Sequence, residues 1–306
     1  MKNADKKTLT VQKKKKVRIG IIGTGMLGNA VGLHLLKSGF DLTVYNRTKE
    51  KTNELKNSGA KVVDSPKSVA ENSELIIIVV KDADAVKKIA FGKNGIVKGR
   101  HAGLTVADMS TINPVESKKI SKKFLKYKII KLDTPVMGGP NVAITGDLVL
   151  MGSGDKKTFD RFKNVFKKIA NKIFFLGGDG TAHLVKLSMN LQITMLALAL
   201  SEGITLVRSA KVDPKIFLDI LNSTYFKTGM SENKAYKMIH NEFDATFTLA
   251  NLKKDISTIT DTAKSFGVNL PMIKKAEKIY ADAVKNGFGD IDYTGILAYI
   301  KKTNSS

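Results

Sequence analysis

A lysine and an asparagine in the second half of the chain are spaced so that both could act on one ligand. Lys186 and Asn190 lie in the stretch GGDGTAHLVKLSMN, four positions apart, so in a helix they would share one face. Burial in a cleft lowers the pKa of an ammonium group, so that a lysine can exchange a proton near neutral pH. Such a group could move the hydroxyl proton while hydride leaves or joins an alcohol carbon. By periodicity alone, however, a lysine on a helix is more often a surface residue.

A glycine-rich turn near the start of the chain has the spacing of a dinucleotide-binding motif. The stretch GIIGTGMLGNA follows an apolar strand and opens a helical pattern. In this context the first glycine permits a tight turn, the second lets a pyrophosphate approach the backbone, and the third allows close packing of helix on sheet. The motif therefore predicts that the cofactor is bound by Gly23, Thr24, Gly25, Met26, Leu27 and Gly28.

The end of the second predicted strand indicates which dinucleotide binds. An NAD site usually carries an acidic residue there, which accepts a hydrogen bond from the ribose 2′-hydroxyl. This chain has Asn46 instead, followed by Arg47 and Thr48. A guanidinium group binds a 2′-phosphate through charge-assisted hydrogen bonds, whereas a carboxylate would repel it. We therefore expect NADP to be favoured over NAD, with these three residues beside the adenosine.

The composition narrows the function classes. The 306 residues contain no cysteine, and the four histidines lie far apart, so we expect no metal site. The net charge is +23, from 51 basic and 28 acidic residues. Because the lysines are spread along the chain in pairs, we interpret this charge as a solvated surface and expect no nucleic-acid partner.

The chain shows no secretory signal or membrane span in its sequence pattern. Its first 16 residues are rich in lysine and lack an apolar core. The apolar run that begins at Leu196 is interrupted by Ser201, Glu202 and Gly203, which leaves it short of a bilayer span. We expect a cytoplasmic protein without a membrane partner.

Apolar runs and helical patterns alternate through the first part of the chain. Strand patterns occur at residues 17–22, 42–46, 75–80, 104–108, 128–133, 147–152 and 172–177. Helical patterns lie between most of them, at Met26–Lys37, Lys49–Asn57 and Asp82–Ala90 among others, and a long one follows from about Thr181 to Ala210. The alternation predicts an α/β fold, a doubly wound Rossmann-type domain followed by an all-α C-terminal domain. The expected parts are a flexible basic leader (1–16), an NADP-binding domain (17–178) and an all-helical substrate and dimerisation domain (179–306).

A loop with little charge follows the predicted strand at residues 128–133. The stretch KLDTPVMGGPNVAITGD contains three glycines and two prolines between short apolar segments. Because ligands of doubly wound folds bind beyond the carboxyl ends of the strands, this loop is expected to bind an anion through its backbone N–H groups.

Five motifs together resemble the β-hydroxyacid dehydrogenase family, which includes 3-hydroxyisobutyrate dehydrogenases and glyoxylate/succinic semialdehyde reductases. They are GTGMLG, DMSTINP, DTPVMGG, GTAHLVKLSMN and FTLANLKKD, in the family's order and spacing. The resemblance implies a reversible hydride transfer between a nicotinamide and a small carboxylate that carries a hydroxyl, aldehyde or keto group. It also implies a homodimer or homotetramer.

The resemblance assigns roles to individual positions. Lys186 matches the family's general acid and base, with Asn190 beside it at the substrate. The other positions that it implies are Val80, Thr111 and Lys254 at the cofactor, and Ser110, Met137, Gly138 and Gly139 at the substrate. Met137 departs from the family, which usually has a serine there that helps to hold the substrate carboxylate, so the substrate stays open. His183 also departs from it, and we expect a structural role.

Two alternatives share this domain plan. The first is an enzyme of the imine reductase type, in which the lysine is usually replaced, so the presence of Lys186 argues against it. The second is a non-catalytic relative that binds nucleic acid or chromatin, which the net charge of +23 would suit. Relatives of that second kind lack the lysine and carry large additional modules.

Overall fold

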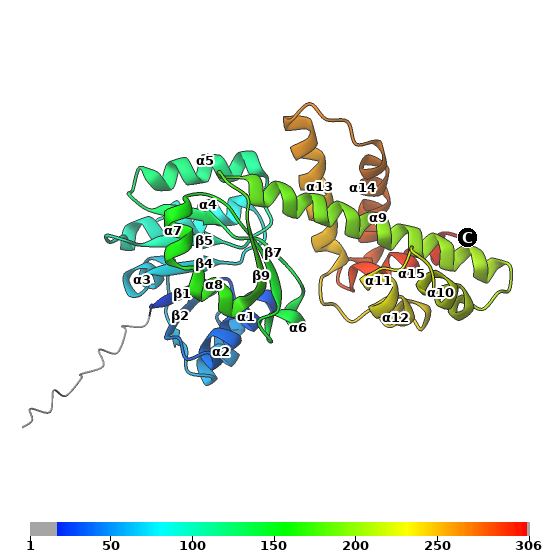
Figure 1. Ribbon diagram of the computed structural model, residues 1–306, viewed down its shortest axis with the longest axis horizontal. Coiled ribbons are helices and arrows are strands. Elements are labelled where there is room, and N and C mark those ends of the chain that lie inside the picture. The colour runs from blue at the N-terminus through cyan, green and yellow to red at the C-terminus, as the bar shows by residue number, and fades with distance from the viewer. Residues whose placement is uncertain (1–16, 305–306) are drawn as a thin grey trace, which may run out of the picture.

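A sheet domain and a helical region are joined by one long helix. The computed structural model of the protein describes residues 17–304, so the predicted leader, residues 1–16, lies outside the described residues. In Figure 1 the helix α9 (Thr181–Ser209) starts beside the sheet domain and runs through the helical region. The predicted combination of a Rossmann-type domain and a helical C-terminal region is confirmed.

Six parallel strands form the main sheet in the order β3-β2-β1-β4-β5-β6. The order reverses between β1 and β4, and in such sheets a ligand binds in the crevice at the carboxyl ends of these strands. The strands are β1 (Ile19–Ile22), β2 (Leu42–Tyr45), β3 (Lys61–Val62), β4 (Leu75–Ile78), β5 (Thr105–Asp108) and β6 (Ile130–Asp133).

Helices cover both faces of this sheet, because its central strands are apolar on both sides. Alternate residues of β1 and β4 enter one core with α1, α7 and α8, and the residues between them enter a second core with α3, α4 and α5. The helices are α1 (Met26–Lys37), α2 (Asn53–Asn57), α3 (Pro66–Asn72), α4 (Ala83–Phe91), α5 (Pro114–Leu125), α6 (Pro140–Ala143), α7 (Lys156–Arg161) and α8 (Lys163–Ile169), with short 3-10 turns at η1 (Lys49–Thr52) and η2 (Ile96–Gly99).

The last strands of the domain do not extend the main sheet. They form a second sheet in the order β7-β8-β9, in which β7 is antiparallel and β9 parallel to β8. Its strands are β7 (Val136–Met137), β8 (Leu148–Gly152) and β9 (Ala170–Phe175). This small sheet supports the glycine-rich loop, because the loop connects β7 to β8.

The helical region packs around α9. Two apolar cores form along this helix, one with α13 and α14 and one with α10 and α12. Its other elements are α10 (Pro214–Asn222), α11 (Gly229–Asn233), α12 (Ala235–Ile239), α13 (Leu249–Ser265), α14 (Pro271–Ala283), a π-turn η3 (Val284–Phe288), a 3-10 turn η4 (Tyr293–Gly295) and α15 (Ile296–Asn304).

Some predicted boundaries differ from the structure. The strand expected at residues 75–80 ends at Ile78, so Val80 lies in the loop that follows β4. The helix expected over Lys49–Asn57 is a 3-10 turn followed by a short α-helix. The strands β3 and β7, each of two residues, were not predicted, because two residues are too few to show a strand periodicity.

Candidate active site

The glycine turn lies between β1 and α1, where a dinucleotide pyrophosphate would bind. Gly23 has a φ of 98°, which favours glycine, and a Cβ atom on Gly28 would overlap with the Gly23 carbonyl oxygen. Gly25, the N-cap of α1, is exposed, and a Cβ atom there would meet nothing within 4 Å among residues 17–304. The first and third glycines thus shape the turn, and Gly25, the second, leaves its outer side open to a ligand at a helix N-terminus.

The turn after β2 is hydrogen-bonded to the glycine turn. The Asn46 side chain accepts a hydrogen bond from the Thr24 backbone N–H (3.1 Å) and donates one to the Thr48 carbonyl (2.8 Å). The Thr24 hydroxyl donates to the Lys51 carbonyl (2.8 Å). The Asn46 side chain, which was predicted to contact the cofactor, therefore links the two turns. Arg47 and Thr48 are exposed beside it.

The loops after β4 and β5 meet each other and the helical region. The Val80 backbone N–H donates to the Ser110 hydroxyl (3.0 Å), and the Ser110 N–H donates to the Asp108 carboxylate (3.0 Å). From α13, the Lys254 ammonium group donates to the carbonyls of Lys81 (2.9 Å) and Thr111 (3.1 Å). The structure thus brings the predicted residues Val80, Ser110, Thr111 and Lys254 to one place.

Lys186 lies half-buried on α9, facing the glycine-rich loop. Its ammonium group donates a hydrogen bond to the Met137 sulfur at 3.1 Å. Burial lowers the pKa of Lys186 to about 8; the nearby Asp255 carboxylate acts in the opposite direction, and the Lys254 ammonium lowers the pKa further. A lysine with this pKa exists in both protonation states near neutral pH, as a general acid or base requires.

Asn190 is buried one turn further along α9. Its side-chain NH₂ donates to the Asp255 carboxylate at 2.7 Å, and Asp255 also pairs with the Lys254 ammonium group. Burial raises the pKa of Asp255, while Lys254 opposes that change. Asn190, Asp255 and Lys254 thus connect α9 with α13. The sequence analysis had assigned no role of its own to Asp255.

The glycine-rich loop lies on the other side of Lys186. Gly138 has a φ of 115°, a value that favours glycine, and Gly139 is the N-cap of the short helix α6. A Cβ atom on Gly139 would lie 3.9 Å from the Thr246 side chain of the helical region. The loop and its Met137 therefore face the junction of the two parts of the protein, together with Lys186.

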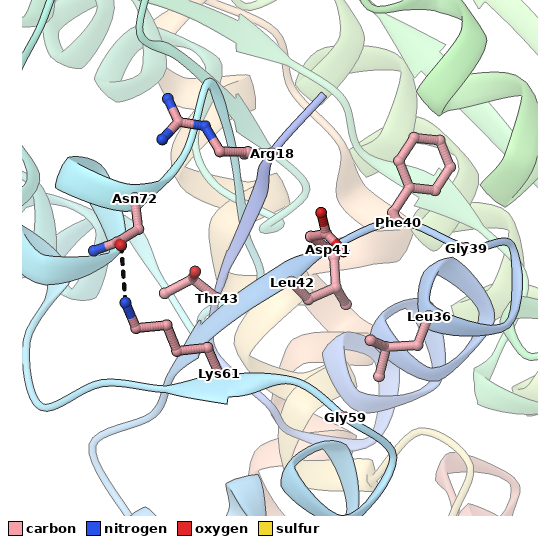
Figure 2. Close-up of a pocket in the computed structure, with 10 residues that line it drawn as sticks. All are labelled: Arg18, Leu36, Gly39, Phe40, Asp41, Leu42, Thr43, Gly59, Lys61 and Asn72. Atoms are coloured by element: carbon pink, nitrogen blue, oxygen red, sulfur yellow. Dashed lines mark hydrogen bonds between the residues drawn. The ribbon is translucent and has the colours of Figure 1, made fainter. Parts of the chain in front are cut away.

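A groove at the opposite edge of the sheet differs from this site. Arg18, Asp41, Lys61 and Asn72 are among the residues that line a hollow of about 450 Å³. Figure 2 shows these side chains, with the Lys61 ammonium hydrogen-bonded to Asn72 (2.9 Å). It lies at the amino ends of the strands, since Leu42 is the first residue of β2. Ligands of doubly wound folds bind at the carboxyl ends. We therefore place the candidate site at the glycine turn and Lys186.

Two family profiles match the chain. The profile of the NAD binding domain of 6-phosphogluconate dehydrogenase matches residues 18–178. The profile described as the NAD-binding domain of NADP-dependent 3-hydroxyisobutyrate dehydrogenase matches residues 180–300. The chain belongs to the β-hydroxyacid dehydrogenase family. It is therefore an NAD(P)-dependent hydroxyacid dehydrogenase.

Individual relatives are similar over nearly the whole chain. A probable 3-hydroxyisobutyrate dehydrogenase-like protein of Arabidopsis thaliana is 30% identical over 294 residues, 94% of this chain and 86% of the relative. Glyoxylate/succinic semialdehyde reductase 2 of the same plant is 28% identical over 289 residues, 94% and 81% of the two chains. The crystal structure of a 3-hydroxyisobutyrate dehydrogenase from Salmonella typhimurium has the same fold, with a TM-score of 0.85 at 23% identity over 93% of this chain and 100% of that one.

Two further findings concern metal-binding groups and membrane-spanning helices. Within residues 17–304, no group of three or more His, Asp or Glu side chains is placed to hold a metal ion. One helix of this range, α9, is long and apolar enough to cross a membrane, with a mean hydropathy of 1.4 over its best window, of which 33% is buried. The core helix of a soluble protein meets the same criteria. In this protein α9 carries the polar residues Lys186 and Asn190 of the candidate site.

Proposed function

We propose that the protein is an NADP(H)-dependent reductase, and in reverse a dehydrogenase, for a small carboxylate with an aldehyde, keto or hydroxyl group. The observation that carries this proposal is the Lys186 ammonium group, which is half-buried at the junction of the two parts with a pKa of about 8. A bound nicotinamide supplies or accepts the hydride in enzymes of this kind. The chain's own residues must then bind the substrate and move one proton.

Lys186 and Asn190 divide this work. In the direction of reduction, Lys186 donates a proton from Nζ to the substrate oxygen that becomes the hydroxyl group; in oxidation, neutral Lys186 accepts it. The Asn190 Oδ1 atom is buried and has no hydrogen-bond partner among residues 17–304. Because Asp255 holds the NH₂ group of the same side chain, Oδ1 is available to accept a hydrogen bond from Lys186 or from the substrate hydroxyl.

The glycine-rich loop supports the substrate carboxylate and places an apolar side chain beside it. Backbone N–H groups at Gly138 and Gly139 can donate to an anion, as successive peptide groups do in other anion-binding turns. Met137 contributes no strong donor, and its flexible thioether forms an apolar wall beside Lys186. We infer that the favoured substrates carry an apolar substituent or a longer chain, and that the smallest, most polar hydroxyacids are disfavoured.

The first test of this function combines a substrate panel with one substitution. Glyoxylate and the succinic, malonic, methylmalonic and tartronic semialdehydes are reduced in turn with NADPH, and oxidation of NADPH is followed by absorbance. We expect Lys186→Met to lower kcat by at least about 100-fold, since general acid catalysis typically contributes that much. The dissociation constant of NADPH should change little. Wild-type turnover by this variant would refute the role of Lys186.

The cofactor preference rests on Arg47, which is exposed at the turn after β2, where no acidic residue is present. A hydrogen bond between charged groups contributes about 1.5–3 kcal/mol, or roughly a factor of ten to a hundred in affinity. Arg47→Gln should therefore raise KM for NADPH by that factor and leave KM for NADH nearly unchanged. The neighbouring Lys49→Gln is the matched control, because Lys49 is paired with Asp64. Equal effects of Arg47→Gln on both cofactors would contradict the assignment.

The oligomeric state is also a proposal. Large apolar side chains are exposed on α9 and α10, namely Leu184, Val185, Met189, Leu206, Ile216 and Ile220. Exposed apolar surface of this kind marks protein–protein contacts, so we propose that these two helices join copies of the chain in a homodimer or homotetramer. Light scattering on the purified protein measures this directly. A monomer at micromolar concentration would contradict it.

A further inference from the structure

A buried cluster of charged residues lies behind the candidate site. The Lys131 ammonium group on β6 pairs with Asp133, lies 3.4 Å from the Asp108 carboxylate and donates to the Ser117 hydroxyl at 2.8 Å. The His183 Nε2 atom is 3.3 Å from the Asp133 carboxylate. All these ionisable side chains have an exposed fraction of zero. The cluster therefore holds two carboxylates and one ammonium group away from water.

Stability alone is a poor explanation for this cluster. The desolvation of buried charges costs about as much as their pairing returns, and apolar residues of similar volume often stabilise a protein equally well or better. Lys131 occupies a strand position flanked by the apolar residues Ile130 and Leu132. A leucine or methionine at 131 would suit such a strand. The buried charges therefore point to a role of the cluster other than stability.

On one side, the cluster holds the start of the helix that carries Lys186. Gly180, the N-cap of α9, has no side chain to cap the helix, and its N–H donates to the Asp133 carboxylate at 2.6 Å. The Ser153 hydroxyl donates to the same carboxylate (3.1 Å) and accepts from the Ala182 N–H (3.3 Å). A carboxylate at a helix N-terminus also interacts favourably with the helix dipole. Asp133 thus supplies, from the sheet, the cap that α9 lacks.

On the other side, the cluster reaches the loops at the cofactor and substrate end. The Asp108 oxygen that does not face Lys131 accepts a hydrogen bond from the Ser110 N–H at 3.0 Å. The Ser110 hydroxyl in turn accepts from the Val80 N–H at 3.0 Å. A continuous series of polar contacts therefore runs from the loops after β4 and β5, through Lys131, to the first turn of α9.

We propose that Lys131, with Asp108 and Asp133, is a positioning group for catalysis that fixes the first turn of α9, and so Lys186, relative to the Ser110 loop. Lys131 touches neither substrate nor cofactor; it acts through the two carboxylates. Because Lys186 follows Gly180 by less than two helical turns, a shift of the cap moves the ammonium group with it. This inference rests on the proposed function of Lys186.

A mild substitution separates positioning from general stability. Ser117→Ala removes a hydroxyl that bonds both Lys131 (2.8 Å) and Asp133 (2.6 Å) without changing any charge. Its matched control is Ser201→Ala, which removes an equally buried hydroxyl of α9 that bonds only the Ala197 carbonyl of its own helix. A misplacement of about 1 Å can cost up to about 100-fold in rate, so we expect Ser117→Ala to lower kcat by about tenfold. Ser201→Ala should leave kcat unchanged.

A stronger pair of variants tests the link itself. Lys131→Met leaves two buried carboxylates without their cation, and this alone should lower the stability of the protein. The double variant Lys131→Met/Asp108→Asn removes one carboxylate together with the cation. The net charge of the buried cluster is therefore the same as in the wild type. We expect this double variant to fold, to bind NADPH, and to keep kcat at least about tenfold below the wild type. Recovery of both melting temperature and wild-type kcat would show a merely structural role and overturn the proposal.

A readout that does not need turnover separates this proposal from the proposed function. Lys186 is modified with trinitrobenzenesulfonate at fixed pH, and the rate at that peptide is followed by mass spectrometry. A displaced α9 should change this rate in Ser117→Ala and in the double variant, but not in Ser201→Ala. If the wild type reduces no member of the panel, the proposed function fails while the modification rates still test the positioning. Unchanged rates and unchanged kcat per NADPH-binding site in both network variants would overturn the inference.

Discussion

The pH dependence of reduction should follow the protonation of Lys186. With a pKa of about 8, the group is about nine-tenths protonated at pH 7 and about one-tenth protonated at pH 9. Because reduction needs the protonated form, kcat/KM for the aldehyde or keto acid should fall about tenfold between these pH values. Oxidation needs the neutral form, so its kcat/KM should rise through the same midpoint. The quantity kcat/KM is the relevant one because its pH dependence reports the pKa values of the free enzyme.

Two substitutions should move this midpoint in opposite directions. The Asp255 carboxylate favours the protonated form of Lys186, and the Lys254 ammonium disfavours it. Asp255→Asn should therefore shift the midpoint toward lower pH, and Lys254→Met toward higher pH. The matched control is Lys253→Met, because Lys253 carries the same charge on the same helix but is not among the groups that shift the Lys186 pKa.

The assay follows NADPH oxidation from pH 6 to 10 at constant ionic strength. Samples quenched at fixed times correct for the acid-catalysed decomposition of NADPH. A profile that is flat between pH 7 and 9, or two variants that shift in the same direction, would refute the reasoning that Lys186 is the titrating acid. A shift in Lys253→Met as large as in Lys254→Met would attribute the effect to general surface charge instead.

Two further predictions concern the glycine turn and the substrate loop. Gly28→Ala should lower the melting temperature and weaken NADPH binding, since its Cβ would overlap with the Gly23 carbonyl and overpacking costs about 1–3 kcal/mol. Gly25→Ala should weaken binding by about tenfold without a change in melting temperature, because its Cβ would meet no protein atom of residues 17–304 within 4 Å and would stand where we expect the pyrophosphate. Titration of NADPH and thermal unfolding without ligand check both, and a stable, tightly binding Gly28→Ala would contradict the packing argument. Met137→Ser should raise kcat/KM for the smallest carboxylates by about tenfold, because a hydroxyl can donate to the anion. The substrate panel measures this, and a uniform loss across the panel would contradict it.

Local patterns account for what could be predicted about the cofactor end. The glycine spacing, the strand before it and the helix after it all lie within about twenty residues, and the helix over Met26–Lys37 has the predicted bounds. The long helix from Thr181 was likewise visible in the sequence, and it ends at Ser209. Asn46 shows the limit of such patterns. Its hydrogen bond to Thr24 arises because β1 and β2 are neighbours in the sheet, and this adjacency is a property of the fold.

The burial of Lys131 among charged partners could not have been predicted from local sequence patterns. A lysine inside an apolar strand pattern suggests a solvent-facing position, because isolated buried lysines are costly. Its partners Asp108, Ser117 and Asp133 come from β5, α5 and β6, and His183 joins them from α9. Only tertiary packing brings these elements together. The presence of two aspartates at the carboxyl ends of neighbouring strands was a usable signal, since parallel strands end at the same edge of a sheet.

The arrangement of the site explains why its chemistry depends on residues in both parts of the protein. The proposed general acid, Lys186, is carried by α9, whose first turn is capped by Asp133 of the sheet domain. Burial lowers the pKa of Lys186, and the two charged groups that also shift this pKa, Asp255 and Lys254, lie on α13. Lys254 also donates hydrogen bonds to the loops after β4 and β5. A change in the angle between the two parts would therefore alter the position and the pKa of Lys186 together. For this reason, substitutions at the junction should affect kcat and the pH profile jointly, whereas substitutions in the glycine turn should affect binding of the dinucleotide first.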